Sequence, residues 1–343
     1  MKRIASVNIQ EIDSVAATQG TQTQLIQVGL SACLAGQLVR YNGGHSQSRY
    51  CLDTLSEYFK FKTYCPEVAA GFSVPRATMR LVGDPNNPML TYSDSKGDND
   101  QEVENLTAQL LNVVIAKVRT FDQLDGYVLM KNSPSCGYQR VKVYQANGHP
   151  HTIRRQGLFT EQLHKRYPLL PIEEEGRLND PRLRENFILR VYAHYCFRHE
   201  VLADLSLHNL IQFHSRYKYT LMAHNQLLYR SLGKMLTGDS ELSIDALALQ
   251  YFTLFMQALG KPASVKNHTN TLLHILGYLK KSVSSRSRVN LMDVIHKYRQ
   301  RKIPLITPLT LLSHYIEQHG SQYIKEQRYF NPYPEALGLR NRI

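Results

Sequence analysis

The 343-residue chain lacks three features that would place it in a special class. No apolar run reaches the roughly 18 residues that a membrane-spanning helix needs, and the N-terminus MKRIASVNIQEIDSVAATQG has no apolar centre of the kind found in signal peptides. The five cysteines are an odd number without closely spaced pairs, which argues against a disulfide framework. We therefore expect a cytoplasmic protein with no membrane partner, whose cysteines are thiols or metal ligands.

Acidic residues are scarce in the second half of the chain. Residues 1–180 hold 19 Lys and Arg against 18 Asp and Glu, whereas residues 181–343 hold 22 against 10. The second half therefore contributes most of the net charge of +13. This asymmetry suggests an anionic partner for that half, either nucleic acid or a nucleotide phosphate, although many basic surfaces only aid solubility.

The hydrophobic pattern divides the chain into three regions. Residues 1–24 are polar and rich in Gln and Thr, which predicts a loosely held extension. Over residues 25–180, strand patterns alternate with helix patterns, as is typical of an α/β domain with a mainly parallel sheet. Over residues 186–343, amphipathic helical runs dominate and several end on Gly, so we expect an all-α domain.

The α/β region has recognisable individual elements. Strands are predicted over 24–30, 59–64 and 125–131, and helices over 48–59 and 105–121. A further helix and a short strand are predicted in GLFTEQLHKRYPLLPIEEEG, and the acidic tract DSKGDNDQEVEN predicts a surface loop. In the helical region the clearest patterns are FILRVYAHYCFRHEVLADL, YTLMAHNQLLYRSLG, LALQYFTLFMQALG and HTNTLLHILGYLK.

Three cysteines follow the ends of three predicted strands. Cys33 comes after LIQVGLSA, Cys65 after FKFKTY, and Cys136 after YVLMKNSPS. Because the carboxyl ends of parallel strands meet at one edge of a sheet, we expect these thiols to converge. Cys51 and Cys196 lie inside amphipathic helical patterns and are expected to be core residues.

Three converging thiolates have few uses. A closed structural zinc site needs four ligands. A four-iron cluster held by three cysteines would leave one iron without a protein ligand, free to accept a substrate atom, although the tight cysteine spacings familiar from such clusters are absent. Cysteine spacing alone leaves zinc and iron–sulfur chemistry open.

Polar residues next to the cysteines are candidates for the same site. Glu67, two residues after Cys65, could act as a general base or acid, or could stabilise a helix N-terminus. Ser31, Ser133 and Ser135 could hydrogen-bond a small polar substrate or only shape their turns.

Basic residues near these motifs are ambiguous. Arg40, Arg76 and Lys131 could hold anionic groups, although such side chains are commonly solvated. In the helical region, Tyr217 and Lys218 lie in a basic and aromatic segment that could contact a phosphate or a nucleobase. At helical spacing such aromatic residues are more often part of the core.

Five segments carry a resemblance to known families. SACLAGQLVRYNGG, CPEVAAGFSVPR and KNSPSCG resemble, in the same order, the three signature blocks of the thiouracil desulfurase family. FHSRYKYTLMAHN and NPYPEALGLRN resemble the YbgA-like domain often fused to it. The resemblance implies a 4Fe-4S cluster held by Cys33, Cys65 and Cys136, with Glu67 and Ser133 as catalytic residues.

The resemblance also implies an activity. The protein would replace C=S by C=O in thiouracil, 4-thiouridine or its monophosphate, releasing sulfide without net redox change. The substrate-binding candidates are Ser31, Arg40, Arg76, Lys131 and Ser135. Asn42 departs from the family pattern, in which Asp is common. The alternative from another class is a basic nucleic-acid-binding or regulatory protein with metal- or redox-sensing cysteines.

Overall fold

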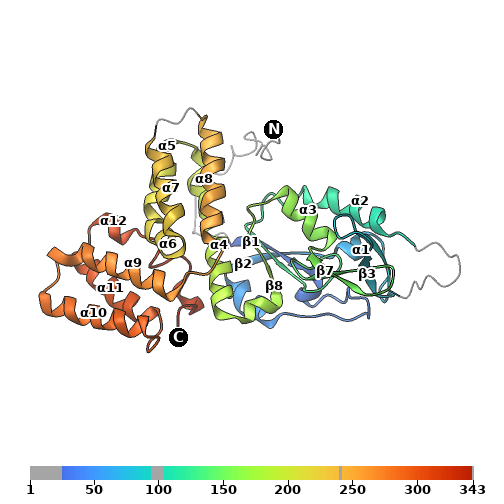
Figure 1. Cartoon of the computed structure of the whole chain (residues 1–343), viewed down its shortest axis with the longest axis horizontal. Coiled ribbons are helices and arrows are strands. Elements are labelled where there is room, and N and C mark those ends of the chain that lie inside the picture. Colours follow the sequence, from blue (N-terminus) through green and yellow to red (C-terminus); the bar gives the residue numbers. More distant parts are fainter. Residues whose placement is uncertain (1–24, 94–103, 239–241, 342–343) are drawn as a thin grey trace, which may run out of the picture. The chain divides into compact units, whose positions relative to one another are not determined.

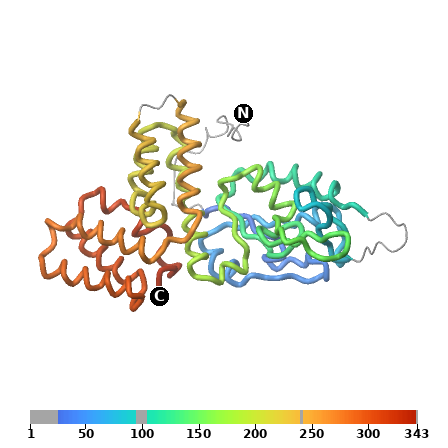
Figure 2. Tube along the Cα trace, viewed as in Figure 1, coloured from blue at the N-terminus to red at the C-terminus, as the bar shows by residue number. Residues whose placement is uncertain are grey.

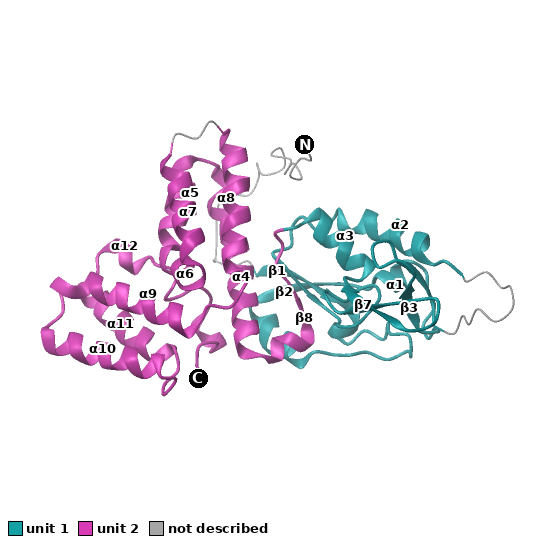
Figure 3. Ribbon diagram, viewed as in Figure 1, with its two compact units in different colours: residues 1–168 teal, residues 169–343 magenta. Residues whose placement is uncertain are grey.

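The computed structural model describes residues 25–93, 104–238 and 242–341. The predicted extension over 1–24 and most of the predicted acidic loop therefore lie outside the described residues. The chain divides into two compact units, residues 1–168 (unit 1) and 169–343 (unit 2), coloured separately in Figure 3. Unit 1 is α/β and unit 2 is mainly helical, which confirms the predicted fold class. None of the helices in the described ranges has the length and apolar character needed to cross a membrane.

In the first sheet of unit 1, β1 lies between two parallel neighbours (Figure 1). β1 (Ile26–Ser31) pairs with β2 (Phe59–Tyr64) on one side and with β5 (Gly126–Leu129) on the other. Val28 and Leu30 of β1 are fully buried, as a strand covered on both faces requires. The three strand predictions are confirmed.

A glycine in β1 makes room for an aromatic cluster. A Cβ atom added to Gly29 would lie 2.2 Å from the ring of Tyr127. That ring packs with Phe121 and Phe159, at centroid distances of 6.0 and 5.5 Å, and Tyr64 lies 5.4 Å from Phe159. The missing side chain therefore lets the aromatic core press directly on the central strand.

A second sheet was not predicted from the sequence. Its strand order is β4-β3-β6-β7, and only the β3–β6 pair is parallel. The chain path through it, over segments 79–92 and 141–155, can be followed in Figure 2. Its strands are β3 (Met79–Val82), β4 (Met89–Tyr92), β6 (Val141–Tyr144) and β7 (Pro150–Arg155). A four-residue strand carries only two inward-facing residues, too few for a clear alternating pattern.

The helices of unit 1 are α1 (Pro66–Ala69), α2 (Thr107–Val118) and α3 (Leu158–Arg166). The α-helix predicted over 48–59 is wrong. That segment forms a π-helical turn over Tyr50–Thr54, in which the N–H of Leu55 bonds the carbonyl of Tyr50, and then a 3₁₀ turn. The bond from Leu55 spans five residues, as in a π-helix, and the turn buries Cys51 and Leu55.

Unit 2 is built from nine α-helices within the described residues, preceded by β8 (Ile172–Glu174). The helices are α4 (Pro181–Glu200), α5 (Leu207–Arg216), α6 (Lys218–His224), α7 (Gln226–Thr237), α8 (Ile244–Leu259), α9 (Val265–Tyr278), α10 (Ser285–Arg299), α11 (Ile306–His319) and α12 (Gln322–Lys325). The single helix predicted over 219–233 is two helices, because the Asn225 side chain accepts the N–H of Leu228 and starts α7. Tyr217 is buried, as the core interpretation predicts.

In unit 2, His268 is buried and His214 is half-buried, and desolvation favours the neutral form of both. Burial lowers the pKa of His214 to about 4 and brings the pKa of His268 well below its ordinary value. Their Nδ1 atoms lie 3.1 Å from the Tyr251 hydroxyl and 2.8 Å from the Tyr329 hydroxyl.

These histidines predict acid sensitivity of the fold. Unfolded histidines bind protons below about pH 6.5, whereas the buried neutral forms do not, so the free energy of unfolding should fall as the pH drops from there towards 4. We expect His268→Gln to reduce this loss by about 2 kcal/mol between roughly pH 7 and 5, measured by urea unfolding. Exposed His319→Gln should behave as wild type; an unaltered pH dependence in the His268 variant would contradict the assignment.

The close contact at Gly29 gives a second prediction. We expect Gly29→Ala to lower the free energy of unfolding by about 1–3 kcal/mol, because the methyl group would overlap the Tyr127 ring. Gly277→Ala in α9 is a matched control, since its added Cβ meets no atom within 4 Å, and should raise the free energy of unfolding by about 0.5–1 kcal/mol. The free energies of unfolding of both variants are measured by urea unfolding. Equal values for the two variants would contradict the packing argument.

Candidate functional site

The ends of β1 and β2 bring two thiols to the same level of the sheet. Ser31 and Tyr64, the last residues of these strands, are in register with each other. Cys65 follows Tyr64 directly, and Cys33 lies two residues beyond Ser31 in a 3₁₀ turn. Cys136 lies in the loop that follows β5, the other neighbour of β1. All three cysteines therefore come from the same edge of the parallel sheet.

A tight turn returns the chain after β5 towards the sheet. The N–H of Gly137 donates to the Ser133 carbonyl at 2.8 Å, and the N–H of Gly157 donates to the Gly137 carbonyl at 2.7 Å. A Cβ atom on Gly137 would lie 2.4 Å from Cγ2 of Val141 and 2.9 Å from the Ser133 carbonyl oxygen. Only glycine fits, and the turn leaves Cys136 buried at 6% exposure.

The three thiols and Glu67 influence one another electrostatically. Burial raises the pKa of Cys33 to about 11, with Cys65 and Glu67 adding to the shift and Arg40 opposing it. Burial also raises the pKa of Cys65, and Glu67 contributes. The pKa of Cys136 lies well above its ordinary value, through burial first and then through Glu67, Cys65 and Cys33. Four acidic groups therefore share one partly dry region.

The chemistry of this donor set fits a bound cationic group. Burial and mutual repulsion both disfavour thiolates, and coordination to a metal reverses that preference. The hydroxyls of Ser135 and Tyr127 are buried without a hydrogen-bond partner among the described residues. No group of three or more His, Cys, Asp and Glu side chains in those residues is arranged to hold a metal ion. The thiolates of a cluster bind different iron atoms and stand farther apart than the ligands of one ion, so the trio remains compatible with a cluster.

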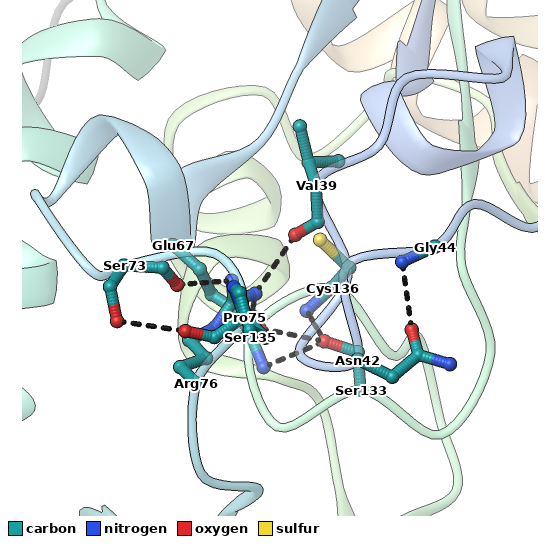
Figure 4. Close-up of polar contacts among 10 residues, drawn as sticks. All are labelled: Val39, Asn42, Gly44, Glu67, Ser73, Pro75, Arg76, Ser133, Ser135 and Cys136. Atoms are coloured by element: carbon teal, nitrogen blue, oxygen red, sulfur yellow. Dashed lines mark hydrogen bonds and ion pairs between the residues drawn. The ribbon is translucent and has the colours of Figure 1, made fainter.

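Glu67 is held between a cation and a hydroxyl (Figure 4). Its Oε2 pairs with Nη2 of Arg76, and its Oε1 lies 3.4 Å from Oγ of Ser133, which donates to it. The Ser133 hydroxyl in turn accepts the backbone N–H groups of Ser135 at 3.2 Å and of Cys136 at 3.0 Å. The carboxylate and the hydroxyl therefore have fixed orientations.

Arg76 binds an anion that belongs to the protein. Its side chain is only 2% exposed, and it donates to the carbonyls of Val39 and Ser73, both at 3.1 Å, as well as to Glu67 (Figure 4). Sequence reasoning grouped Arg76 with the substrate-binding candidates. In the structure its guanidinium ties two loops to the Glu67 carboxylate.

The remaining candidates have different surroundings. Ser31 is buried and accepts the backbone N–H of Met130 at 3.1 Å. Arg40 donates to Oγ of Ser46 at 2.7 Å and affects the nearby Cys33 thiol. Lys131 is exposed. Ser31 and Arg40 therefore lie at the edge that carries the thiols.

Two tyrosines near the thiols were missed by sequence reasoning. The hydroxyls of Tyr64 and Tyr127 are buried and lack a hydrogen-bond partner among the described residues. Burial raises the pKa of Tyr64 to about 12 and that of Tyr127 well above its ordinary value, with Cys136 adding to both shifts. They are neutral phenols beside the trio. The only sequence signal was that Tyr64 directly precedes Cys65.

Comparison with known proteins covers both units. Residues 28–175 match the family model described as 2-thiouracil desulfurase, and residues 218–334 match the model described as protein of unknown function (DUF1722). The chain is 30% identical over 165 residues to the uncharacterized protein YbgA of Escherichia coli (strain K12), which covers 48% of this chain and 98% of YbgA. It is 29% identical over 109 residues to the uncharacterized protein YbbK of Bacillus subtilis (strain 168), covering 32% of this chain and 71% of YbbK.

One solved structure is also similar. The [4Fe-4S]-dependent thiouracil desulfidase TudS aligns with 48% of this chain and 99% of its own chain, at 23% sequence identity and a TM-score of 0.36. The family assignment rests instead on the two family models and on the match to YbgA along nearly its whole length. The chain therefore belongs to the family of YbgA, and it joins a domain that matches the 2-thiouracil desulfurase model to a YbgA-like helical domain.

Proposed function

We propose that the protein is an iron–sulfur-dependent desulfurase of thiolated uracil compounds, namely thiouracil, 4-thiouridine or its monophosphate. Water adds to the thiocarbonyl carbon, C=S becomes C=O, and hydrogen sulfide leaves without net redox change. The family match of residues 28–175 supports the reaction class. The observation that carries the proposal is that Cys33, Cys65 and Cys136 follow parallel strands at the same edge of the sheet, with Glu67 close to Cys65 in the chain.

In this proposal Cys33, Cys65 and Cys136 hold a 4Fe-4S cluster. A cluster with three protein ligands offers one iron that can bind a soft sulfur atom and act as a Lewis acid. The protein has to keep three thiolates together in a partly buried place, which the raised pKa values of the free thiols oppose. Cluster binding and thiol ionisation are therefore coupled.

Glu67 is proposed to act as the general base. Its Oε1 accepts a proton from the attacking water, while Arg76 holds Oε2 and so fixes which oxygen is available. Ser133 donates to the same Oε1 from 3.4 Å and is itself anchored by two backbone N–H groups. In this role Ser133 orients the carboxylate and can shift its donation to a developing negative charge. The polar groups of the substrate are proposed to contact Ser31, Arg40, Lys131 and Ser135.

Substitution of the site residues tests the proposal. After anaerobic reconstitution with iron and sulfide, Glu67→Gln should lower kcat for thiouracil by about 10²–10⁴-fold, because it removes the base. Its iron content and visible absorbance should stay at the wild-type level, since no cluster ligand is lost. Cys136→Ser should lose both iron and turnover.

Cys196→Ala is the matched control, because Cys196 is buried in α4 of unit 2, whereas the three proposed cluster ligands lie in unit 1. It should keep iron and activity. Full turnover by Cys136→Ser, or wild-type kcat in Glu67→Gln, would overturn the assignment. Bound iron in the wild type without turnover of any thiolated uracil compound would favour the alternative, a regulatory protein with metal- or redox-sensing cysteines.

We also propose that unit 2 binds nucleic acid. Residues 280–302, which include α10, hold eight Lys and Arg against one Asp. All eight cations except Arg288 are exposed, and Lys297 pairs with that Asp, Asp293. A largely uncompensated cationic segment on and around α10 attracts a phosphate backbone.

Salt dependence tests this second proposal. The logarithm of the binding constant for an RNA oligonucleotide should fall linearly with the logarithm of salt concentration, as expected for counterion release. A triple Arg286→Gln, Arg299→Gln, Lys302→Gln variant should lower the magnitude of that slope by about one per lost phosphate contact. Exposed Lys60 of β2 supplies the control variant, Lys60→Gln. Absence of binding at low salt, or an unchanged slope in the triple variant, would contradict the proposal.

A further inference from the structure

A cavity of about 410 Å³ lies on the second sheet of unit 1. This volume is within the range of roughly 300–1,000 Å³ that is usual for small-molecule sites. Its walls come from β3, from β6 and from the loop that precedes β6. The residues that matter for its chemistry are Arg80, Arg140, Lys142, Tyr144, Asn132 and Pro134.

The strand register explains why cations gather there. Leu81 of β3 is in register with Val143 of β6, and both side chains are fully buried. Side chains alternate between the two faces of a sheet, so the preceding residues, Arg80 and Lys142, project from the opposite face. Tyr144 lies on that same face, and the guanidinium of Arg80 is 5.6 Å from the centre of its ring.

The charge of the cavity is not balanced by the described residues around it. None of Arg80, Arg140 and Lys142 forms an ion pair with a carboxylate in the described part of the chain. Nε of Arg80 is also buried without a hydrogen-bond partner there. A half-buried arginine with an unused donor, beside two further cations, is chemically suited to an anion.

The cavity borders the site that contains Glu67. Asn132 and Pro134 line its wall, and the residue between them is Ser133, whose hydroxyl lies 3.4 Å from Oε1 of Glu67. Consecutive Cα atoms are about 3.8 Å apart. One loop therefore separates the basic cavity from the proposed general base. A uridine nucleotide has its phosphate one sugar away from its base, which matches a span across a single loop.

We propose that this cavity is the phosphate subsite of the active site, and the inference rests on the proposed desulfurase function. Arg80, stacked on Tyr144, would bind two phosphate oxygens through its guanidinium, while Arg140 and Lys142 would contribute charge from the rim. The ligand is a phosphate attached to the ribose of a thiolated uridine. It can be the monoester of a free nucleotide or the diester of an RNA strand.

Kinetics with and without the phosphate test the subsite. The reconstituted full chain would be assayed on 4-thiouridine, 4-thiouridine monophosphate and an RNA oligonucleotide with one internal 4-thiouridine. In Arg80→Gln and in the double variant Arg140→Gln, Lys142→Gln, the ratio of kcat/KM for a phosphorylated substrate to that for the nucleoside should fall about tenfold or more. Arg119→Gln, an exposed cation outside the cavity, should keep the wild-type ratio.

A fall for the monophosphate identifies a terminal phosphate as the ligand, and a fall for the oligonucleotide alone identifies a backbone diester. Unchanged ratios for both substrates in both variants would overturn the subsite. Arg80→Gln could fail to fold because Arg80 is half-buried. The double variant changes only the exposed residues Arg140 and Lys142, so its folding should not be affected.

Binding without turnover separates this inference from the proposed reaction. Calorimetry with uridine monophosphate and with uridine needs no catalysis, and the variants should weaken only the binding of uridine monophosphate, by about tenfold. If the wild type desulfurates none of the three substrates yet binds uridine monophosphate in a way that depends on Arg80, the proposed function fails and the subsite stands. If it desulfurates them but all variants bind uridine monophosphate equally, the subsite fails and the proposed function stands.

Discussion

Parallel pairing of β1 with β2 on one side and with β5 on the other brings three strand ends to one edge of a sheet. Had either neighbour been antiparallel, its following loop would have left from the opposite edge and taken its cysteine with it. The pairing is compatible with a dense aromatic core only because Gly29 leaves room for the Tyr127 ring. Packing around β1 thus fixes the position of the loops that carry the three cysteines.

The same edge of the sheet carries more acidic groups, three thiols and Glu67, than nearby cations that could neutralise them. Cys33, Cys65 and Glu67 all raise the pKa of the Cys136 thiol, and Arg40 only partly opposes the same effect at Cys33. Arg76 is committed to Glu67 through an almost fully buried ion pair. A cationic cluster bound to the thiolates would supply the missing charge, and this accounts for thiols held in a region where free thiolates are disfavoured.

The sequence predicts those parts of the molecule whose signal is local. The strands that precede Cys33 and Cys65 are six residues long, one largely apolar and the other alternating aromatic and polar residues, so their ends and the exit of both thiols could be located in advance. The contact of Ser133 with Glu67 joins residues 66 positions apart, and no local pattern encodes it. Arg76 shows the same limit, since its pairing with Glu67 depends on how the intervening loop folds. The second sheet escaped prediction because its β3, β4 and β6 strands are four residues long.

The loop from Lys131 to Gly137 borders both the basic cavity and the site that contains Glu67. Asn132 adopts a left-handed conformation, with φ of 58°, which Asn tolerates better than most residues. It lines the basic cavity together with Pro134, whereas Ser133 between them turns to Glu67. Three successive residues therefore serve two surfaces, one basic and one beside the thiols. Gly137 closes the turn on the Ser133 carbonyl, so a shift of the cavity wall would also move the hydroxyl that orients the carboxylate. An anion bound in the cavity, as proposed, would therefore be coupled mechanically to the orientation of the Glu67 carboxylate.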